Sequence, residues 1–253
     1  MTTSVIPGGL VTTQDEAGLA VEAAKRIGTV LRDTIKRRGA VTFALSGGNT
    51  PRPAYERLAA EPGVDWSKVS IFWIDDRAVP PTHERSNYRM AKESLLDRAK
   101  IPASNVHRMM GEAADLDQAA RDYEAVLRKY VQPASGLDAT GVPSFDVAVM
   151  GIGDDGHTAS LFPGEKAVQV RDRLVLAVPA APAKGREARL TVSAPVVEQI
   201  GTIFVLVAGE SKRAALERIW SVSGSTEETP SRILRDTNAN IVWVLDKAAA
   251  GVT

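Results

Sequence analysis

The sequence contains three histidines, His83, His107 and His157, and no cysteine. Histidine is the side chain best suited to proton transfer near neutral pH, whereas the lack of cysteine excludes a thiolate nucleophile, a disulfide framework and a cysteine-based metal site. Of the three, only His157 follows an apolar strand-like run among carboxylates, in the stretch GIGDDGHTASLFPG at 151–164. A histidine beside an aspartate such as Asp155 is the arrangement of a general base whose tautomer and orientation are fixed by a carboxylate.

The same stretch must be tested against two other kinds of site. Gly151, Gly153 and Gly156 have the G-x-G-x-x-G spacing of dinucleotide-binding turns. However, two adjacent aspartates inside the turn would repel a pyrophosphate, and Pro163 leaves room for only a short helix, so we reject that interpretation. Two aspartates and one histidine without further clustered ligands are a weak metal pattern. We therefore expect neither a metal nor a cofactor, and a purely structural histidine remains an alternative.

A second polar cluster, Asp75-Asp76-Arg77, follows the predicted strand Ser70–Ile74. Two carboxylates and a guanidinium at the carboxyl end of a strand could orient a polyhydroxylated substrate and bind its phosphate, since arginine carries a planar fork of donors. The alternative is ordinary exposed charge, because such groups are common on protein surfaces. Asp75 and Arg77 are candidate catalytic residues, and the sequence does not decide which of the two aspartates faces a substrate.

A third candidate is the polar loop that follows the first predicted buried strand, formed by Ser46, Gly47, Gly48, Asn49 and Thr50. Glycines at this place let backbone N–H groups approach an anion, and the dipole of the helix that begins at Pro51 adds positive potential. The loop lacks the G-x-x-x-x-G-K-[ST] pattern, so it is not a nucleotide P-loop. The alternative is a plain turn in which Thr50 caps the helix.

Two cations complete the candidate set. Lys212 lies in the predicted first turn of a helix after the strand Ile203–Val207, where a positive charge opposes the helix dipole, and this unfavourable place favours a functional explanation. A solvated surface lysine is the alternative. Arg189 lies upstream in the chain and is a further candidate cation for binding a phosphate.

The elements that must position these groups alternate between strand and helix. Non-alternating apolar runs predict buried strands at Val41–Leu45, Ser70–Ile74, Phe145–Met150, Leu174–Val178, Ile203–Val207 and Ile241–Leu245, with a weaker one at Val106–Met109. Helical periodicity predicts helices at Gln14–Arg38, Pro51–Ala60, Asn87–Ala99, Asp117–Tyr130, Ala194–Ile200, Ser211–Trp220 and Ser231–Arg235. This order predicts one α/β domain over residues 1–253, a mainly parallel, Rossmann-like doubly wound sheet with helices on both faces. Ligands then bind outside the carboxyl ends of the strands.

The composition limits the partners. The 253 residues carry 31 Lys and Arg against 31 Asp and Glu, so no net field draws the chain to nucleic acid or to a membrane. No apolar run reaches the ~18 to 20 residues of a spanning helix, and the N-terminus lacks the basic start and apolar stretch of a secretory signal. We expect a cytoplasmic protein that acts on a small molecule, with no nucleic-acid or membrane partner.

Taken together, these motifs resemble the 6-phosphogluconolactonases of the glucosamine-6-phosphate isomerase/6-phosphogluconolactonase family. The resemblance is carried by LSGGNTPRPAYERL, IFWIDDRAVPPTHERSNYRMAKESLL and FDVAVMGIGDDGHTASLFPG, and more loosely by ARLTVSAPVV and VAGESKRAAL. It implies the metal-free hydrolysis of the sugar-phosphate lactone 6-phospho-D-glucono-1,5-lactone to 6-phospho-D-gluconate, in the oxidative pentose phosphate pathway.

The resemblance also implies a role for each candidate residue. His157 would activate water beside Asp155, Arg77 would contact the substrate or its phosphate, and Lys212 would bind the phosphate with Gly47, Gly48 and Thr50. The chain departs from many lactonases in having Asp76 where they have Glu, and the alignment of Arg189 is the loosest.

Two other functions remain open at this point. Glucosamine-6-phosphate deaminases resemble the chain at the phosphate loop, but they typically carry Tyr in place of Arg77 and a Glu a few residues beyond the loop histidine. Here no carboxylate follows His157 until Glu165. A non-catalytic sugar-phosphate sensor would have no need of His157.

Overall fold

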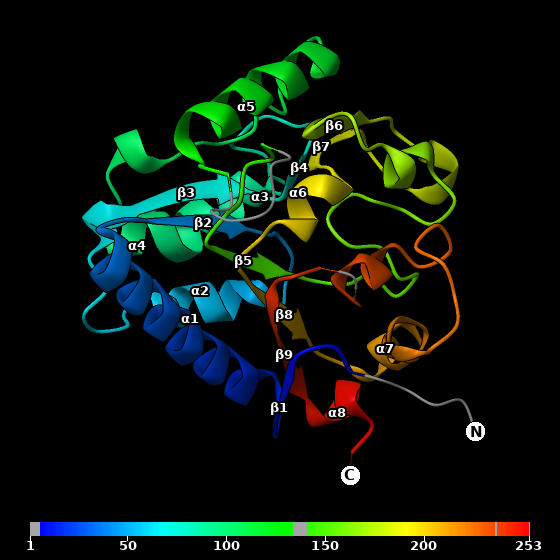
Figure 1. Ribbon diagram of the computed structural model, residues 1–253, viewed down its shortest axis with the longest axis horizontal. Coiled ribbons are helices and arrows are strands. Elements are labelled where there is room, and N and C mark those ends of the chain that lie inside the picture. Colours follow the sequence, from blue (N-terminus) through cyan, green and yellow to red (C-terminus); the bar gives the residue numbers. More distant parts are fainter. Residues whose placement is uncertain (1–5, 134–140, 236, 253) are drawn as a thin grey trace.

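A six-stranded parallel sheet forms the centre of the protein (Figure 1). The computed structural model describes residues 6–133, 141–235 and 237–252. The strand order is β1-β9-β8-β5-β2-β3, and every neighbouring pair is parallel. The strands are β1 (Gly9–Thr13), β2 (Val41–Leu45), β3 (Val69–Trp73), β5 (Val147–Met150), β8 (Thr202–Val207) and β9 (Asn240–Asp246). Because the strands are parallel, their carboxyl ends meet along one edge of the sheet.

Helices cover both faces of this sheet, as the sequence predicted. In Figure 1, α1 (Glu16–Arg38), α2 (Pro51–Leu58), α3 (Asn87–Ala91) and α4 (Asp97–Ala99) lie on one side, and α6 (Ala194–Glu198) and α7 (Arg213–Trp220) lie on the other. The remaining helices are α5 (Leu116–Tyr130) and α8 (Lys247–Ala250). None of the described helices is long and apolar enough to cross a membrane.

Local signals explain where the longest helix begins and ends. Asp15 caps α1, since its carboxylate accepts a hydrogen bond from the N–H of Gly18. Gly39 ends the helix in the left-handed conformation with φ 82°, a geometry that glycine adopts without a steric penalty. Between these caps the apolar stripe that includes Leu19 and Ile27 is fully buried.

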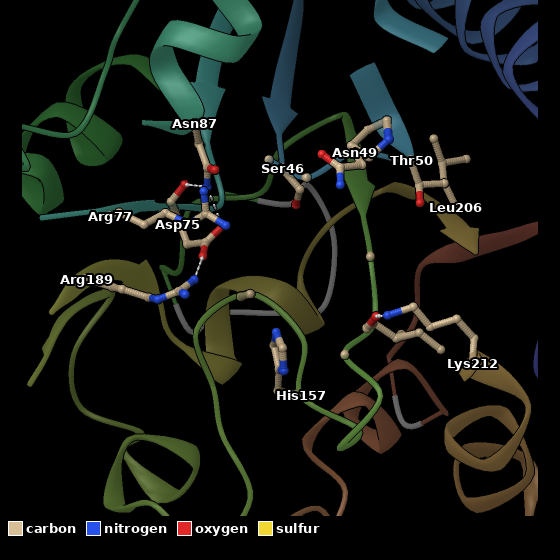
Figure 2. Close-up of a pocket in the computed structure, with 17 residues that line it drawn as sticks. Ser46, Asn49, Thr50, Asp75, Arg77, Asn87, His157, Arg189, Leu206 and Lys212 are labelled. Atoms are coloured by element: carbon tan, nitrogen blue, oxygen red, sulfur yellow. Dashed lines mark hydrogen bonds and ion pairs between the residues drawn. The ribbon is translucent and has the colours of Figure 1, made fainter. Parts of the chain in front are cut away.

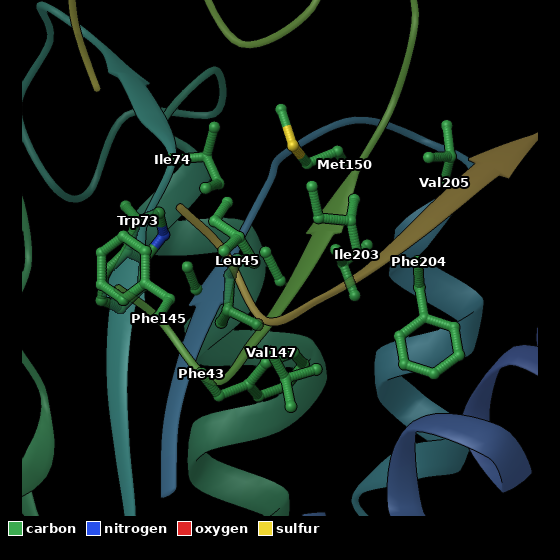
Figure 3. Packing of buried hydrophobic residues seen from close by; sticks show 14 of the residues in the cluster. Phe43, Leu45, Trp73, Ile74, Phe145, Val147, Met150, Ile203, Phe204 and Val205 are labelled. Carbon is green, nitrogen blue, oxygen red and sulfur yellow. The ribbon is translucent and has the colours of Figure 1, made fainter. Parts of the chain in front are cut away.

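The central strands are buried on both faces, which accounts for their lack of alternation. Figure 3 shows Phe43 and Leu45 of β2 packed near Val147 of β5 and Ile203 of β8, and all four side chains are fully buried. An alternating strand would have placed polar groups beneath a covering helix. This burial makes the edge with the carboxyl ends a rigid platform for the loops that follow.

A second, antiparallel sheet of three strands was not predicted. It has the order β4-β7-β6, with β4 (Asp75–Arg77), β7 (Arg189–Val192) and β6 (Val175–Val178). The chain changes partner at Ile74: its N–H donates to Leu45 of the large sheet, while its carbonyl accepts from Val192 of the small one. The polar cluster Asp75-Asp76-Arg77, which follows the predicted strand Ser70–Ile74, is therefore itself a strand, β4.

Some of the sequence-based elements need correction. The strand predicted at Leu174–Val178 exists as β6, but it pairs antiparallel outside the main sheet. The weak strand at Val106–Met109 is reduced to one bridge between Val106 and Ile71, and Ser231–Arg235 lies in a 3-10 helix. The sequence also missed β1, an edge strand in which no residue is buried and which therefore lacks a continuous apolar run.

Candidate active site

A cavity of about 350 Å³ opens at the carboxyl ends of β2, β5 and β8 (Figure 2). Three cationic side chains, one carboxylate and one histidine line it together with polar loop residues. The lining residues are Ser46, Gly47, Gly48, Asn49, Thr50, Pro51, Asp75, Arg77, Asn87, Gly151, Ile152, Gly153, His157, Ala159, Arg189, Leu206 and Lys212. The excess of positive charge suits an anionic ligand such as a phosphate.

The polar loop Ser46–Thr50 forms one wall of the cavity. It is held by the fully buried Tyr55, whose hydroxyl accepts from the Ser46 N–H at 3.2 Å and donates to the Ser46 carbonyl at 3.0 Å. Thr50 precedes α2, but its side chain makes no capping hydrogen bond there. The side chain of Thr50 therefore does not cap α2, and its hydroxyl can contact a ligand at the cavity wall.

Two glycines of this loop are required by their surroundings. A Cβ at Gly47 would lie 1.7 Å from Oδ1 of Asn87, and Gly48 has φ 110°. Larger residues would push the loop away from Asn87 or strain its backbone. Glycine at both positions keeps this backbone close to the cavity, where its N–H groups can approach an anion.

His157 and Asp155 form a directly bonded pair. Nδ1 of His157 lies 2.6 Å from Oδ1 of Asp155, and the hydrogen bond from the imidazole lowers the pKa of Asp155 to about 2. An ionised carboxylate only accepts hydrogen bonds, so Nδ1 carries a proton, and Nε2 is the ring nitrogen left to accept one. Figure 2 shows the imidazole standing within the cavity. The geometry is that of an oriented base.

The loop around this pair is tightly turned. The N–H of Gly153 donates to the carbonyl of His157 at 2.8 Å, and a Cβ at Gly153 would lie 2.0 Å from Nδ1 of His157. The imidazole also packs on Phe162, with ring centroids 4.6 Å apart. Glycine at 153 thus serves the packing of the histidine rather than a pyrophosphate.

Asp75 lines the cavity and organises its neighbours. It is 5% exposed, and its carboxylate accepts from the Ser160 hydroxyl at 2.6 Å and from Nδ2 of Asn87 at 3.2 Å. A guanidinium nitrogen of Arg189 lies 3.6 Å away. Desolvation by burial lowers the pKa of Arg189, whereas the charge of Asp75 opposes that change. Asp75 therefore holds Arg189 at the cavity wall.

Asp76 is turned away from the cavity into the protein. Its carboxylate accepts from the N–H groups of Arg77, Asn87 and Tyr88, and burial nevertheless raises the pKa of Asp76 to about 6. Successive residues of a strand point to opposite faces, so only one of the two aspartates can face the cavity. The structure places Asp75 there, which answers the question that the sequence left open.

Arg77 and Arg189 reach the cavity from neighbouring strands. They are directly opposite each other in the pairing of β4 with β7, so their side chains leave the small sheet on the same face. Nη1 of Arg77 donates to the carbonyl of Arg85 at 2.7 Å, which holds the side chain along the cavity wall. The small sheet is thus what brings the two guanidinium groups together.

Lys212 enters from the other side of the cavity. It lies in a short 3-10 turn before α7, and Nζ donates to the carbonyl of Ile152 at 3.0 Å and pairs with Oδ1 of Asp154 at 2.6 Å. The structure therefore brings Lys212 to the same cavity as the loop Ser46–Thr50 and His157.

Sequence reasoning missed several residues of the site. Asn87 lines the cavity and Ser160 bonds Asp75, yet neither comes directly after a predicted strand, since both lie about ten residues further along the chain. The other two histidines do not line the cavity: His107 stacks between Phe72 and Tyr130, with ring centroids 4.7 and 4.3 Å away, and Nδ1 of His83 accepts from the N–H of Arg85. Within the described residues no three His, Asp or Glu side chains are grouped as a metal site would require.

Comparison with known sequences places the chain in a family. It matches the family described as glucosamine-6-phosphate isomerases/6-phosphogluconolactonase over residues 14–243. It is 40% identical over 221 residues to a 6-phosphogluconolactonase of Synechocystis sp., an alignment that covers 87% of this chain and 88% of the relative. A 6-phosphogluconolactonase of Nostoc sp. is 38% identical over 235 residues, covering 93% and 94%.

Solved structures agree with this placement. The crystal structure of 6-phosphogluconolactonase from Leishmania guyanensis has a TM-score of 0.85 at 27% identity, covering 97% of this chain and 98% of that chain. A monomeric glucosamine-6-phosphate deaminase shares the fold, with a TM-score of 0.77 at 20% identity and coverage of 97% and 100%. The resemblance predicted from the motifs is confirmed, and the chain belongs to the glucosamine-6-phosphate isomerase/6-phosphogluconolactonase family.

Proposed function

We propose that this chain is a 6-phosphogluconolactonase, which hydrolyses 6-phospho-D-glucono-1,5-lactone to 6-phospho-D-gluconate in the oxidative pentose phosphate pathway. Its relatives of that name cover nearly the whole chain. The single observation that carries the mechanism is the bonded pair of His157 and Asp155 beside a cavity with three cations. A lactone is an activated ester, so a positioned base and anion stabilisation suffice without a covalent intermediate.

In the proposed reaction, Nε2 of His157 takes a proton from water while the water oxygen attacks the C1 carbonyl of the lactone. Asp155 holds Nδ1–H and stabilises the imidazolium that forms. Arg77 or loop N–H groups favour the negative charge on the carbonyl oxygen. The bond from C1 to the ring oxygen then breaks, and the imidazolium returns its proton to that oxygen, which yields the open acid.

The phosphate of the substrate is bound by the loop Ser46–Thr50 and by Lys212 in this proposal. The loop brings N–H groups and the Thr50 hydroxyl to the cavity, and Lys212 adds a positive charge to the same cavity, across from Arg77 and Arg189 in Figure 2. Arg189, held by Asp75, lies on the side of Arg77. A cytoplasmic location and a single domain over residues 1–253 stay predictions from the sequence.

The test generates the lactone in situ by oxidation of glucose 6-phosphate and follows acid formation, with spontaneous hydrolysis subtracted. We expect His157→Ala to lower kcat about 10²- to 10⁴-fold, the usual contribution of a positioned base. Binding of the product 6-phosphogluconate should survive, which shows that the variant folds. Hydrolysis at the wild-type rate in His157→Ala would exclude His157 as the base.

Two further measurements separate the alternatives. Lys212→Ala should lose discrimination between the phosphorylated and unphosphorylated lactones, and an unchanged preference would remove Lys212 from the phosphate site. Release of ammonia from glucosamine 6-phosphate would indicate a deaminase. A protein that binds 6-phosphogluconate but accelerates neither reaction would be a sensor.

A further inference from the structure

The ammonium group of Lys212 is shared between the cavity and a carboxylate of the histidine loop. Two of its three N–H donors are taken: one by the Ile152 carbonyl at 3.0 Å and one by Oδ1 of Asp154 at 2.6 Å. Asp154 does not line the cavity, whereas Lys212 does. The charge that Lys212 presents to the cavity is therefore partly neutralised by a carboxylate that lies outside the lining.

The two anchors of Lys212 differ in strength. The Ile152 carbonyl belongs to the backbone that follows β5, and the lysine side chain is 23% exposed, so its place is fixed by packing and backbone. The Asp154 side chain is 62% exposed and is otherwise touched by the Ser211 hydroxyl at 3.3 Å. Exposed ion pairs of this kind are weak and are screened by salt, so an incoming dianion can displace the carboxylate.

We propose that Asp154 is an internal counter-ion of Lys212 that competes with the phosphate of the ligand and so limits the affinity of the site for phosphorylated sugars. The inference rests on the proposed function, since it takes Lys212 as a phosphate contact. The carboxylate of Asp154 pairs with Lys212, and a phosphate that binds Lys212 must displace it. Asp154 thereby favours release of the anionic product.

The opposite role for Asp154 would be to position the lysine for the ligand. The contacts favour competition between Asp154 and the phosphate. The Ile152 carbonyl already positions Nζ of Lys212, and a neutral group could position the lysine without repelling an anionic ligand as the carboxylate of Asp154 does. The two roles make opposite predictions for the isosteric Asp154→Asn, which keeps an oxygen acceptor for Lys212 and removes only the negative charge.

The experiment is a titration of the protein with 6-phosphogluconate at low ionic strength. We expect Asp154→Asn to lower Kd about 2- to 5-fold, the usual strength of an exposed ion pair, because the phosphate no longer has to displace a carboxylate from Lys212. At ~1 M salt, where screening acts over about 3 Å, the gain should largely vanish. Asp117→Asn, an equal change of charge on the exposed side of α5, is the matched control and should leave Kd unchanged.

A weaker or unchanged affinity in Asp154→Asn would overturn the proposal, and weaker binding would instead assign Asp154 to positioning. The double variant Asp154→Asn/Lys212→Met tests whether Asp154 acts through Lys212. The decrease in Kd caused by Asp154→Asn should be smaller in the Lys212→Met background, because the ammonium group for which Asp154 competes is absent. An undiminished gain in the Lys212→Met background would also overturn competition for Lys212. If Lys212→Met alone binds 6-phosphogluconate as tightly as the wild type, then the proposed role of Lys212 fails, independently of Asp154.

Discussion

The contact between Asp155 and His157 makes the sharpest prediction about catalysis. Asp155→Asn replaces the carboxylate by an amide of the same shape, so the fold is retained while the charge next to the imidazole is lost. The amide can also turn its NH₂ group toward Nδ1, which would place the imidazole proton on Nε2 and remove the base. We expect kcat to fall because the imidazolium of the transition state has lost its carboxylate.

The size of the effect follows from the structure. The pKa of Asp155 is lowered from 3.8 to about 2, chiefly by the 2.6 Å hydrogen bond with His157. That difference corresponds to about 2.4 kcal/mol before screening. Because the Asp155 side chain is 53% exposed, we discount it to about 1 to 2 kcal/mol. The loss of the charge alone is thus expected to decrease kcat about 5- to 30-fold, and an amide that also moves the imidazole proton to Nε2 would bring kcat down to the level of His157→Ala.

The assay compares acid formation by wild type, Asp155→Asn, His157→Ala and the double variant, each corrected for spontaneous hydrolysis. If Asp155 acts through the imidazole, then the double variant should be no slower than His157→Ala, since groups that act as a unit are not additive. The reasoning would be refuted by a wild-type rate in Asp155→Asn. It would equally be refuted if Asp155→Asn slowed His157→Ala by the same factor as it slows the wild type.

Three further predictions concern the walls of the site and its support. Gly47→Ala should raise Kd for 6-phosphogluconate at least about 10-fold with an unchanged circular dichroism spectrum, because its Cβ would lie 1.7 Å from Oδ1 of Asn87; unchanged binding would contradict this. Tyr55→Phe should lower the free energy of unfolding in urea by about 1 to 3 kcal/mol, because both backbone groups of Ser46 lose a buried partner, and a smaller loss would mean that water replaces the hydroxyl. The pKa of Asp76 is raised from 3.8 to about 6, so between pH 4 and 6 this carboxyl is protonated in the folded protein but ionised in the unfolded chain. The free energy of unfolding should therefore fall by up to about 3 kcal/mol as pH rises through that window, and Asp76→Asn should lack this fall in urea titrations at pH 4 to 7; equal slopes in both proteins would refute it.

Sequence reasoning identified the parallel sheet and the groups that lie within single loops. The loop Ser46–Thr50 and the pair of Asp155 and His157 each come from a few consecutive residues after a buried strand. Their proximity is set by chain connectivity, and the apolar run before each one is a strong local signal. Such features can be predicted without knowledge of distant contacts.

The antiparallel sheet could not be predicted in the same way. β4 has three residues with charged side chains, Asp75, Asp76 and Arg77, and it is a strand only because β7 pairs with it more than a hundred residues later. Short strands of this kind have no periodicity of their own, because their conformation is decided by the partner. The same pairing determines that Asp75 rather than Asp76 faces the cavity.

By itself, then, the sequence determined the family, the alternation of strands and helices that forms a parallel sheet, and the place of a histidine beside an aspartate in the same loop. Tertiary structure alone decided which distant charges share the cavity: Arg189 through its pairing with Arg77, and Lys212 through its bond to the Ile152 carbonyl. The physical reason is that connectivity enforces local contacts, whereas contacts between distant charges depend on how strands pair and helices pack.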